Sequence, residues 1–183
     1  MIHFLLLVSR QGKVRLSRWY FPPVAGAAEG GSRGPSPSGA QEGGSFEGGS
    51  FSMKQRNDLL REAASRVLQR SAKQCNVVEW REDTKLVFKR YASLYFIACI
   101  DSNENALLTL EVIHHFVEIL DRYFGNVCEL DLIFNFHKAY YLLDEIVCGG
   151  ELQETSKKAV LRVTNAQDAL MDESNVKGGT KLT

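Results

Sequence analysis

Residues 111–145, EVIHHFVEILDRYFGNVCELDLIFNFHKAYYLLDE, decide the fold of this chain. Their spacing predicts two helices joined at Gly125, which suits a left-handed helix end. Asn126 is then expected to be the N-cap of the second helix, with Glu129 at the third position of a capping box. That helix, extending to about Val147, is apolar on nearly every side. A soluble helix of this kind must be covered on every side, so the stretch predicts either a subunit of a larger assembly or a protein that holds an apolar ligand.

Outside this stretch, alternating and helical spacings predict a compact α+β domain. Strands are expected at 2–8, 13–17, 76–81, 85–91 and 94–100, and helices at 54–70, 105–124 and 155–171. The first strand, IHFLLLV, is continuously apolar and should be buried on both faces. The element order ββαβββαα, followed by a C-terminal helix, predicts a five-stranded antiparallel sheet flanked by helices.

One segment interrupts the domain that we expect over residues 1–172. Residues 21–53 hold all four prolines and nine of the fifteen glycines. Such a composition buries too little apolar surface to offset the entropy of ordering, so we predict a disordered insertion. A phosphorylation site at Ser36 or Ser38, each beside Pro37, is the alternative to an inert linker. Residues 173–183 are expected to form a polar, flexible tail.

Composition restricts the classes of partner. The 22 basic and 22 acidic residues balance, which gives no support for broad electrostatic binding to nucleic acid. The four cysteines form no CxxC pair, which favours a reduced, cytosolic chain with buried thiols over a disulfide framework. The apolar run at 2–8 is too short to span a membrane and lacks the features of a signal peptide, so any membrane role should be peripheral.

The sequence offers no recognisable catalytic chemistry. GxSxG, GxxxxGK and HExxH motifs do not occur. His114 and His115 are adjacent and point about 100° apart on a helix, so they do not chelate one metal. His137 is expected to be a structural histidine, and Cys99 and Cys128 to be small core residues. We therefore predict a protein that is not an enzyme and that has no catalytic residue, metal or cofactor.

Several long motifs resemble the small (sigma) subunits of the heterotetrameric clathrin adaptor complexes, most closely that of adaptor complex 1. They are MIHFLLLVSRQGKVRLSRWY at 1–20, CNVVEWR at 75–81, KRYASLYFIACID at 89–101, IHHFVEILDRYFGNVCELDLIFNFHKAYYLLDE at 113–145 and GELQETSKK at 150–158. The resemblance covers about 1–20 and 54–172. It implies a longin-like fold clasped by a large subunit, which agrees with the element order predicted from the residues.

The resemblance also implies partners and a location. The large subunit would be of the gamma type, with beta and medium (mu) subunits completing the complex, and clathrin and membrane would be reached through that complex. The cargo would carry acidic dileucine signals, [DE]xxxL[LI], and would travel between the trans-Golgi network and endosomes. The chain would then be cytoplasmic and peripheral on those membranes and on clathrin-coated vesicles.

Carried over by position, the resemblance implies a pocket for the two leucines of the signal. Its residues would be Ala92, Leu94, Val117, Asn126, Val127, Leu130 and Leu132. Arg15, together with Arg10, would meet the acidic residue of the signal. Periodicity alone assigns Val117, Leu130 and Leu132 to the core instead. In the helix expected between Asn126 and Val147, one face made of Ile133, Phe136, Tyr140 and Leu143 is expected to pack on the sheet, while other faces meet the large subunit.

Other functions stay open at this point. The chain could be a structural brace for a large subunit with its pocket unused, or the related small subunit of the plasma-membrane adaptor or of coatomer. A longin-type SNARE regulator would need a coiled-coil heptad run and a tail anchor, and neither follows residue 150.

Overall fold

A computed structural model describes residues 1–20, 52–71, 73–81 and 83–178. The predicted insertion falls outside these residues except for Ser52 and Met53, which belong to the first helix. The Ser52 hydroxyl accepts the Gln55 amide at 3.3 Å, and the Gln55 side chain accepts the Ser52 amide at 2.8 Å. This reciprocal capping box starts the helix one residue earlier than predicted.

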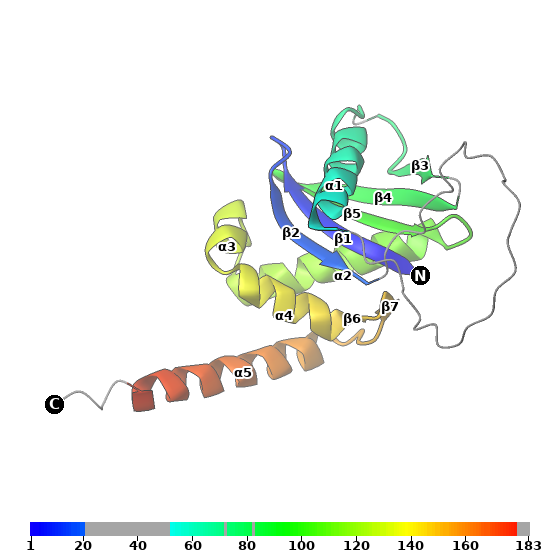
Figure 1. The fold of residues 1–183 in the computed structure, drawn as a ribbon. Helices are drawn as coiled ribbons and strands as arrows, with labels where there is room; N and C mark the ends of the chain where they lie inside the picture. Colours follow the sequence, from blue (N-terminus) through cyan, green and yellow to red (C-terminus); the bar gives the residue numbers. More distant parts are fainter. Residues whose placement is uncertain (21–51, 72, 82, 179–183) are drawn as a thin grey trace, which may run out of the picture.

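Five antiparallel strands form one sheet in the order β2-β1-β5-β4-β3 (Figure 1). They are β1 Ile2–Ser9, β2 Val14–Trp19, β3 Val77–Arg81, β4 Thr84–Tyr91 and β5 Leu94–Asp101. The helices are α1 Met53–Leu68, α2 Ala106–Phe124, α3 Glu129–Phe134, α4 Phe136–Ile146 and α5 Lys157–Gly178, and a small hairpin joins β6 Val147–Cys148 to β7 Glu151–Leu152. The predicted α+β class and longin-like order are confirmed.

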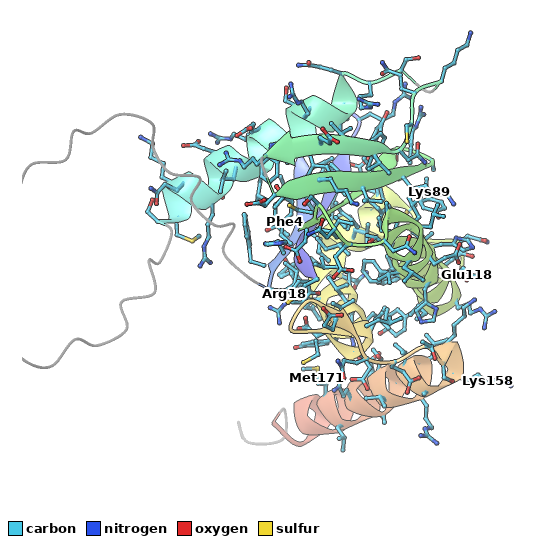
Figure 2. All side chains as sticks on the ribbon, turned by 90° about the vertical axis from the view of Figure 1, so that its right-hand side faces the viewer. Phe4, Arg18, Lys89, Glu118, Lys158 and Met171 are labelled. Atoms are coloured by element: carbon cyan, nitrogen blue, oxygen red, sulfur yellow. The ribbon has the colours of Figure 1, made fainter. Side chains whose placement is uncertain are left out.

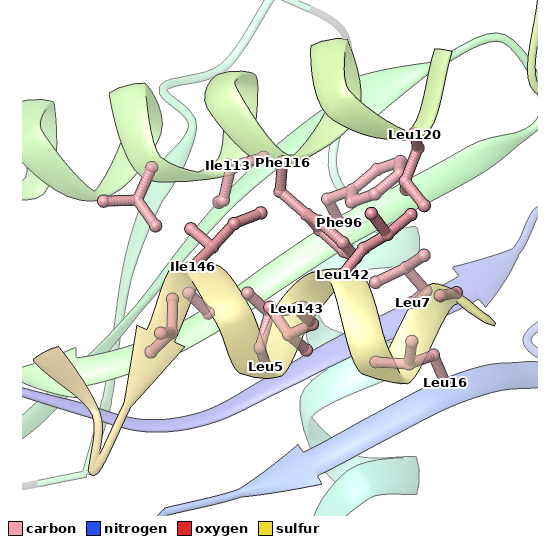
Figure 3. Packing of buried hydrophobic residues seen from close by; sticks show 14 of the residues in the cluster. Leu5, Leu7, Leu16, Phe96, Ile113, Phe116, Leu120, Leu142, Leu143 and Ile146 are labelled. Atoms are coloured by element: carbon pink, nitrogen blue, oxygen red, sulfur yellow. The ribbon is translucent and has the colours of Figure 1, made fainter. Parts of the chain in front are cut away.

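Helices cover both faces of the sheet, and β1 is buried throughout as predicted. Its side chains alternate because successive residues of a strand point to opposite faces. Phe4 and Leu6 pack with α1, whereas Leu5 and Leu7 pack with α2 and α4. Figure 3 shows the second core, where Phe116 of α2 and Leu142 of α4 meet over the sheet. These two cores fix the helices to the sheet.

The joint after α2 is longer than predicted. Gly125 ends α2 in the left-handed conformation (φ 66°), as expected, but Asn126 is also left-handed (φ 69°) and does not cap the next helix. Cys128 occupies the N-cap position, and its amide donates to Asp131 Oδ2 at 2.8 Å. The predicted capping box was therefore displaced by two residues, with Asp131 in the position assigned to Glu129.

The single helix predicted up to Val147 is wrong, because Asn135 (φ −118°, ψ 37°) separates α3 from α4. The predicted sheet-facing side is wrong as well. Leu143 is buried and Tyr140 is half-buried, but Ile133 and Phe136 are exposed. The residues facing inward in this region are instead Leu132, Ala139, Leu142, Leu143 and Ile146, which keep helical spacing on a face shifted by one residue from the predicted one.

The C-terminal helix continues past the predicted end at Met171 and reaches Gly178. It packs on α4 and α2, away from the sheet (Figure 1). The expectation of buried thiols holds only for Cys99, since Cys75, Cys128 and Cys148 are free and exposed. No helix in the described ranges is long and apolar enough to cross a membrane.

Candidate functional site

Arg15 lies on β2 and forms an ion pair with Glu129, the first residue of α3. Its Nε donates to Glu129 Oε1 at 2.9 Å, and its Nη2 lies 2.7 Å from the same oxygen. The second carboxylate oxygen, Oε2, accepts a weaker contact from the Ser93 hydroxyl at 3.5 Å. Both members of the pair are half-buried, so the pair is shielded from solvent better than an ordinary surface pair.

Two hairpin tips lie beside this ion pair. The amide of Arg10, in the β1–β2 turn, donates to the Ser93 carbonyl at 3.1 Å and so joins this turn to the β4–β5 turn. Ala92 occupies the latter turn in the left-handed conformation (φ 49°) and is exposed. Its carbonyl accepts from Arg90 Nε at 3.0 Å. The side chain of Arg10 is exposed near the pair, whereas that of Arg15 is already engaged.

The seven residues predicted to hold the leucines come from the β4–β5 turn, α2, the α2–α3 joint and α3. We call this set the hairpin–α3 corner. Leu94 and Leu132 are buried in the core, and Val117 and Val127 pack half-buried against the same hydrophobic cluster. Ala92, Asn126 and Leu130 are exposed. The structure therefore brings four of the seven into one cluster and leaves Leu94 and Leu132 without an accessible surface for a ligand.

A cavity of about 360 Å³, lined in part by Met1 and Ile2, lies at the other end of the sheet. None of the seven corner residues lines it. Its lining includes apolar Ile2, Leu108 and Val112 together with His115. Burial lowers the pKa of His115 below its usual value. Sequence spacing did not single out this cavity, because its residues come from β1, β5, α2 and the β6–β7 hairpin.

Exposed apolar side chains follow α3 and the start of α4. We call Ile133, Phe134, Phe136 and Tyr141 the α3–α4 apolar surface; Leu130, which belongs to the hairpin–α3 corner, is exposed beside them. Phe134 is 74% exposed and Leu130 is 60% exposed. Exposed apolar groups in such a cluster are typical of a surface that binds another protein. The sequence predicted an uncovered surface on this helix pair but assigned Ile133 and Phe136 to the wrong side.

Polar contacts secure α5 to α2 and α4. Lys157 pairs with Glu118, and Lys138 and Tyr123 both donate to Asp168. Figure 2 shows Glu118 on α2 near the start of α5. Burial acts to raise the pKa of Asp168, but the hydrogen bonds from Lys138 and Tyr123 outweigh it and lower that pKa. These contacts hold α5 in place and suggest no catalytic role.

The pairing of Glu129 with Arg15 is the contact at this site that sequence reasoning missed. The pattern assigned Glu129 to a capping box, whereas it binds a side chain 114 positions away in the chain. No local signal marks such a contact. Within the described ranges, no group of three or more His, Cys, Asp or Glu residues could hold a metal ion.

Comparison with known proteins agrees with the fold and with the predicted resemblance. The model of the clathrin adaptor complex small chain family matches residues 49–170. AP-1 complex subunit sigma-2 of Dictyostelium discoideum is 54% identical over 170 residues, covering 93% of this chain and 92% of its own length. AP-1 complex subunit sigma-1A of Homo sapiens is 46% identical over 173 residues, covering 94% of this chain and 91% of its own.

A structural relative supports the same assignment. One chain of a homology model of the full-length AP-3 complex in a stretched open conformation superposes with a TM-score of 0.63 at 26% identity, covering 97% of this chain and 99% of that chain. The fold, the family model and the extent of these matches agree. The chain belongs to the clathrin adaptor complex small chain family and is a non-enzymatic subunit.

Proposed function

We propose that the chain is the sigma subunit of an adaptor complex of the AP-1 type, binding a gamma-type large subunit within a complex completed by beta and medium subunits. The complex would carry cargo between the trans-Golgi network and endosomes, and would reach membrane and clathrin through its other subunits. The chain itself would be cytoplasmic and peripheral on these membranes. The observation that carries the proposal is the α3–α4 apolar surface, together with the AP-1 names of the relatives.

The α3–α4 apolar surface is the part that binds the large subunit. It is interrupted by the joint at Asn135, so two short helices present apolar groups in two directions. Phe134 and Phe136 lie on either side of the joint, and Tyr141 follows five residues after Phe136. Large aromatic residues of this kind dominate the energetics of protein interfaces. A large subunit that wraps around both helices would bury them together.

The hairpin–α3 corner is the part that binds acidic dileucine signals. Each leucine that loses its contact with water contributes roughly 1.5–3 kcal/mol. The corner residues with apolar surface left to offer are Ala92, Val117, Val127 and Leu130. Leu94 and Leu132 are buried in the adjoining core. Arg15 and Arg10 would attract the acidic residue, which adds specificity and association rate more than affinity.

Peptide binding to the assembled complex tests this site. Val117→Asp and Leu130→Ser should each abolish binding of an acidic dileucine peptide, measured by fluorescence anisotropy, while the subunits still co-purify. Leu132→Ser is unsuitable, because this side chain is buried and its loss would perturb folding. Leu107→Ser is the matched control, since Leu107 is exposed on α2 outside the corner. Normal peptide affinity in both corner variants would refute the proposed site.

A structural brace is the second candidate, and one observation favours it. Leu94 and Leu132 are sealed inside the core, so these two residues offer no surface to a leucine of the signal in this structure. On this view, the chain stabilises the large subunit and no peptide binds to the corner. Wild-type complex that fails to bind any acidic dileucine peptide, although fully assembled, would favour the brace.

A further inference from the structure

The Arg15–Glu129 pair places a carboxylate of the chain itself where the proposed function requires one from the cargo. We propose that Glu129 is a built-in competitor for the acidic residue of the sorting signal, holding the hairpin–α3 corner closed until a signal displaces it. The inference rests on the proposed function and adds a control element to that site. Glu129 would act by contacting Arg15, whereas the other residues of the site contact the leucines.

The geometry of the pair supports this role. Nε and Nη2 of Arg15 both lie within 2.9 Å of one Glu129 oxygen, so this edge of the guanidinium is already engaged. Of the residues that the structure describes, Glu129 is the one whose carboxylate lies within 4.0 Å of the Arg15 guanidinium. An incoming carboxylate that reached the same edge would meet a like charge, and the two would repel at close range. A signal carboxylate must therefore replace Glu129 to pair with Arg15 through the Nε–Nη2 edge.

The same carboxylate also links the segments that surround the corner. Glu129 starts α3, Arg15 belongs to β2, and Ser93 belongs to the β4–β5 turn beside Leu94. α3 is only six residues long and lies between the left-handed Asn126 and the break at Asn135. Release of Glu129 would therefore free a short unit that carries both Leu130 and Leu132. Recognition of the acid would in this way be coupled to exposure of the leucine-binding residues.

The test is Glu129→Gln in the fully assembled complex, with binding of an acidic dileucine peptide measured by fluorescence anisotropy. Glutamine keeps the size of the side chain and removes its charge. We expect about tenfold tighter binding, equivalent to about 1.4 kcal/mol at 25 °C. A matched peptide with its acidic residue replaced by glutamine should gain much less. Hydrogen exchange should also rise in the α3 amides of the variant, which reports release of the segment independently of any peptide.

A neighbouring ion pair provides the control. Arg18, also on β2, pairs with Asp144 of α4 at 2.9 Å (Figure 2 labels Arg18). Asp144→Asn should break this pair and leave peptide affinity unchanged. Unchanged or weaker binding by the Glu129→Gln complex, or an equal gain for both peptides, would overturn the competitor role while leaving the binding site itself intact. Failure of the wild-type complex to bind either peptide would instead refute the proposed function.

Discussion

Phe134→Ala should weaken binding to the large subunit and leave folding intact, whereas Leu142→Ala should destabilise the fold. Both residues belong to the same apolar stretch of sequence. Phe134 is 74% exposed, whereas Leu142 of α4 is fully buried in the core that α4 shares with α2 and the sheet. With about 200 Å² for an aromatic side chain, the exposed part of Phe134 amounts to roughly 150 Å². At about 25 cal/mol per Å², covering that area contributes up to about 4 kcal/mol. The loss of translational, rotational and side-chain freedom on association offsets part of this gain.

We therefore expect Phe134→Ala to weaken binding to the gamma-type large subunit by about 2 kcal/mol or more, roughly 30-fold. Its unfolding free energy should change by no more than about 0.5 kcal/mol, because the side chain has few partners to lose. Leu142→Ala should lower the unfolding free energy by about 2–5 kcal/mol.

Titration calorimetry with the large subunit and urea denaturation of the full chain measure the two quantities. Wild-type affinity in the Phe134→Ala chain, or a loss of stability comparable to that of Leu142→Ala, would contradict the assignment of the α3–α4 apolar surface to the partner.

Three further outcomes can be checked on the full chain. Gly125→Ala should lower the free energy of unfolding, measured by urea denaturation, by about 1 kcal/mol, because Gly125 is left-handed but has open space around it. Gly150→Ala should lower it clearly more, since the added Cβ would also clash with the Ile2 carbonyl. Equal losses in the two variants would refute this reading. Three thiols should react rapidly with a disulfide reagent and Cys99 slowly, because burial raises the pKa of Cys99 to about 12; four equal rates would contradict it. Burial lowers the pKa of His115, so the folded state binds a proton at this residue less readily than the unfolded state does. The contribution of neutral His115 to the free energy of unfolding should therefore be fully present above the unfolded pKa of about 6.5 and should be lost as the pH falls below it. His115→Gln should flatten the decline in thermal melts, and an unaltered pH profile would exclude this histidine as its cause.

Sequence periodicity predicted the sheet well because each strand must satisfy a simple rule. The continuous apolar run of β1 follows directly from burial of both its faces. In β2, Leu16 is buried as its alternating pattern indicates, although Val14 is exposed. α2 was equally clear, since Asn105 accepts the Leu107 amide and Gly125 ends the helix. These signals are local, and local signals survive without knowledge of the tertiary structure.

The α3–α4 region was harder because tertiary contacts override its spacing. Asn135 interrupts a pattern that reads as one continuous helix, and the inward face is shifted by one residue from the face that the spacing suggested. Glu129 satisfied a capping pattern, but its actual partner is Arg15 on β2. The hairpin–α3 corner was identified by resemblance alone, and its closed state could not be read from residue types, because burial of Leu94 and Leu132 depends on segments distant in sequence.

The position of β1 in the sheet has a consequence for how the chain is made. β1 pairs with β2 a few residues later, but its other edge pairs with β5, where Ser9 lies opposite Leu94 and Ile2 opposite Ile100. At roughly 5–20 residues per second, the ribosome adds the intervening residues over several seconds. Throughout that interval an apolar strand keeps one edge without its hydrogen-bonding partner, which is the condition under which strands aggregate. Newly synthesised chains should therefore depend on chaperones until Asp101 has emerged from the ribosome.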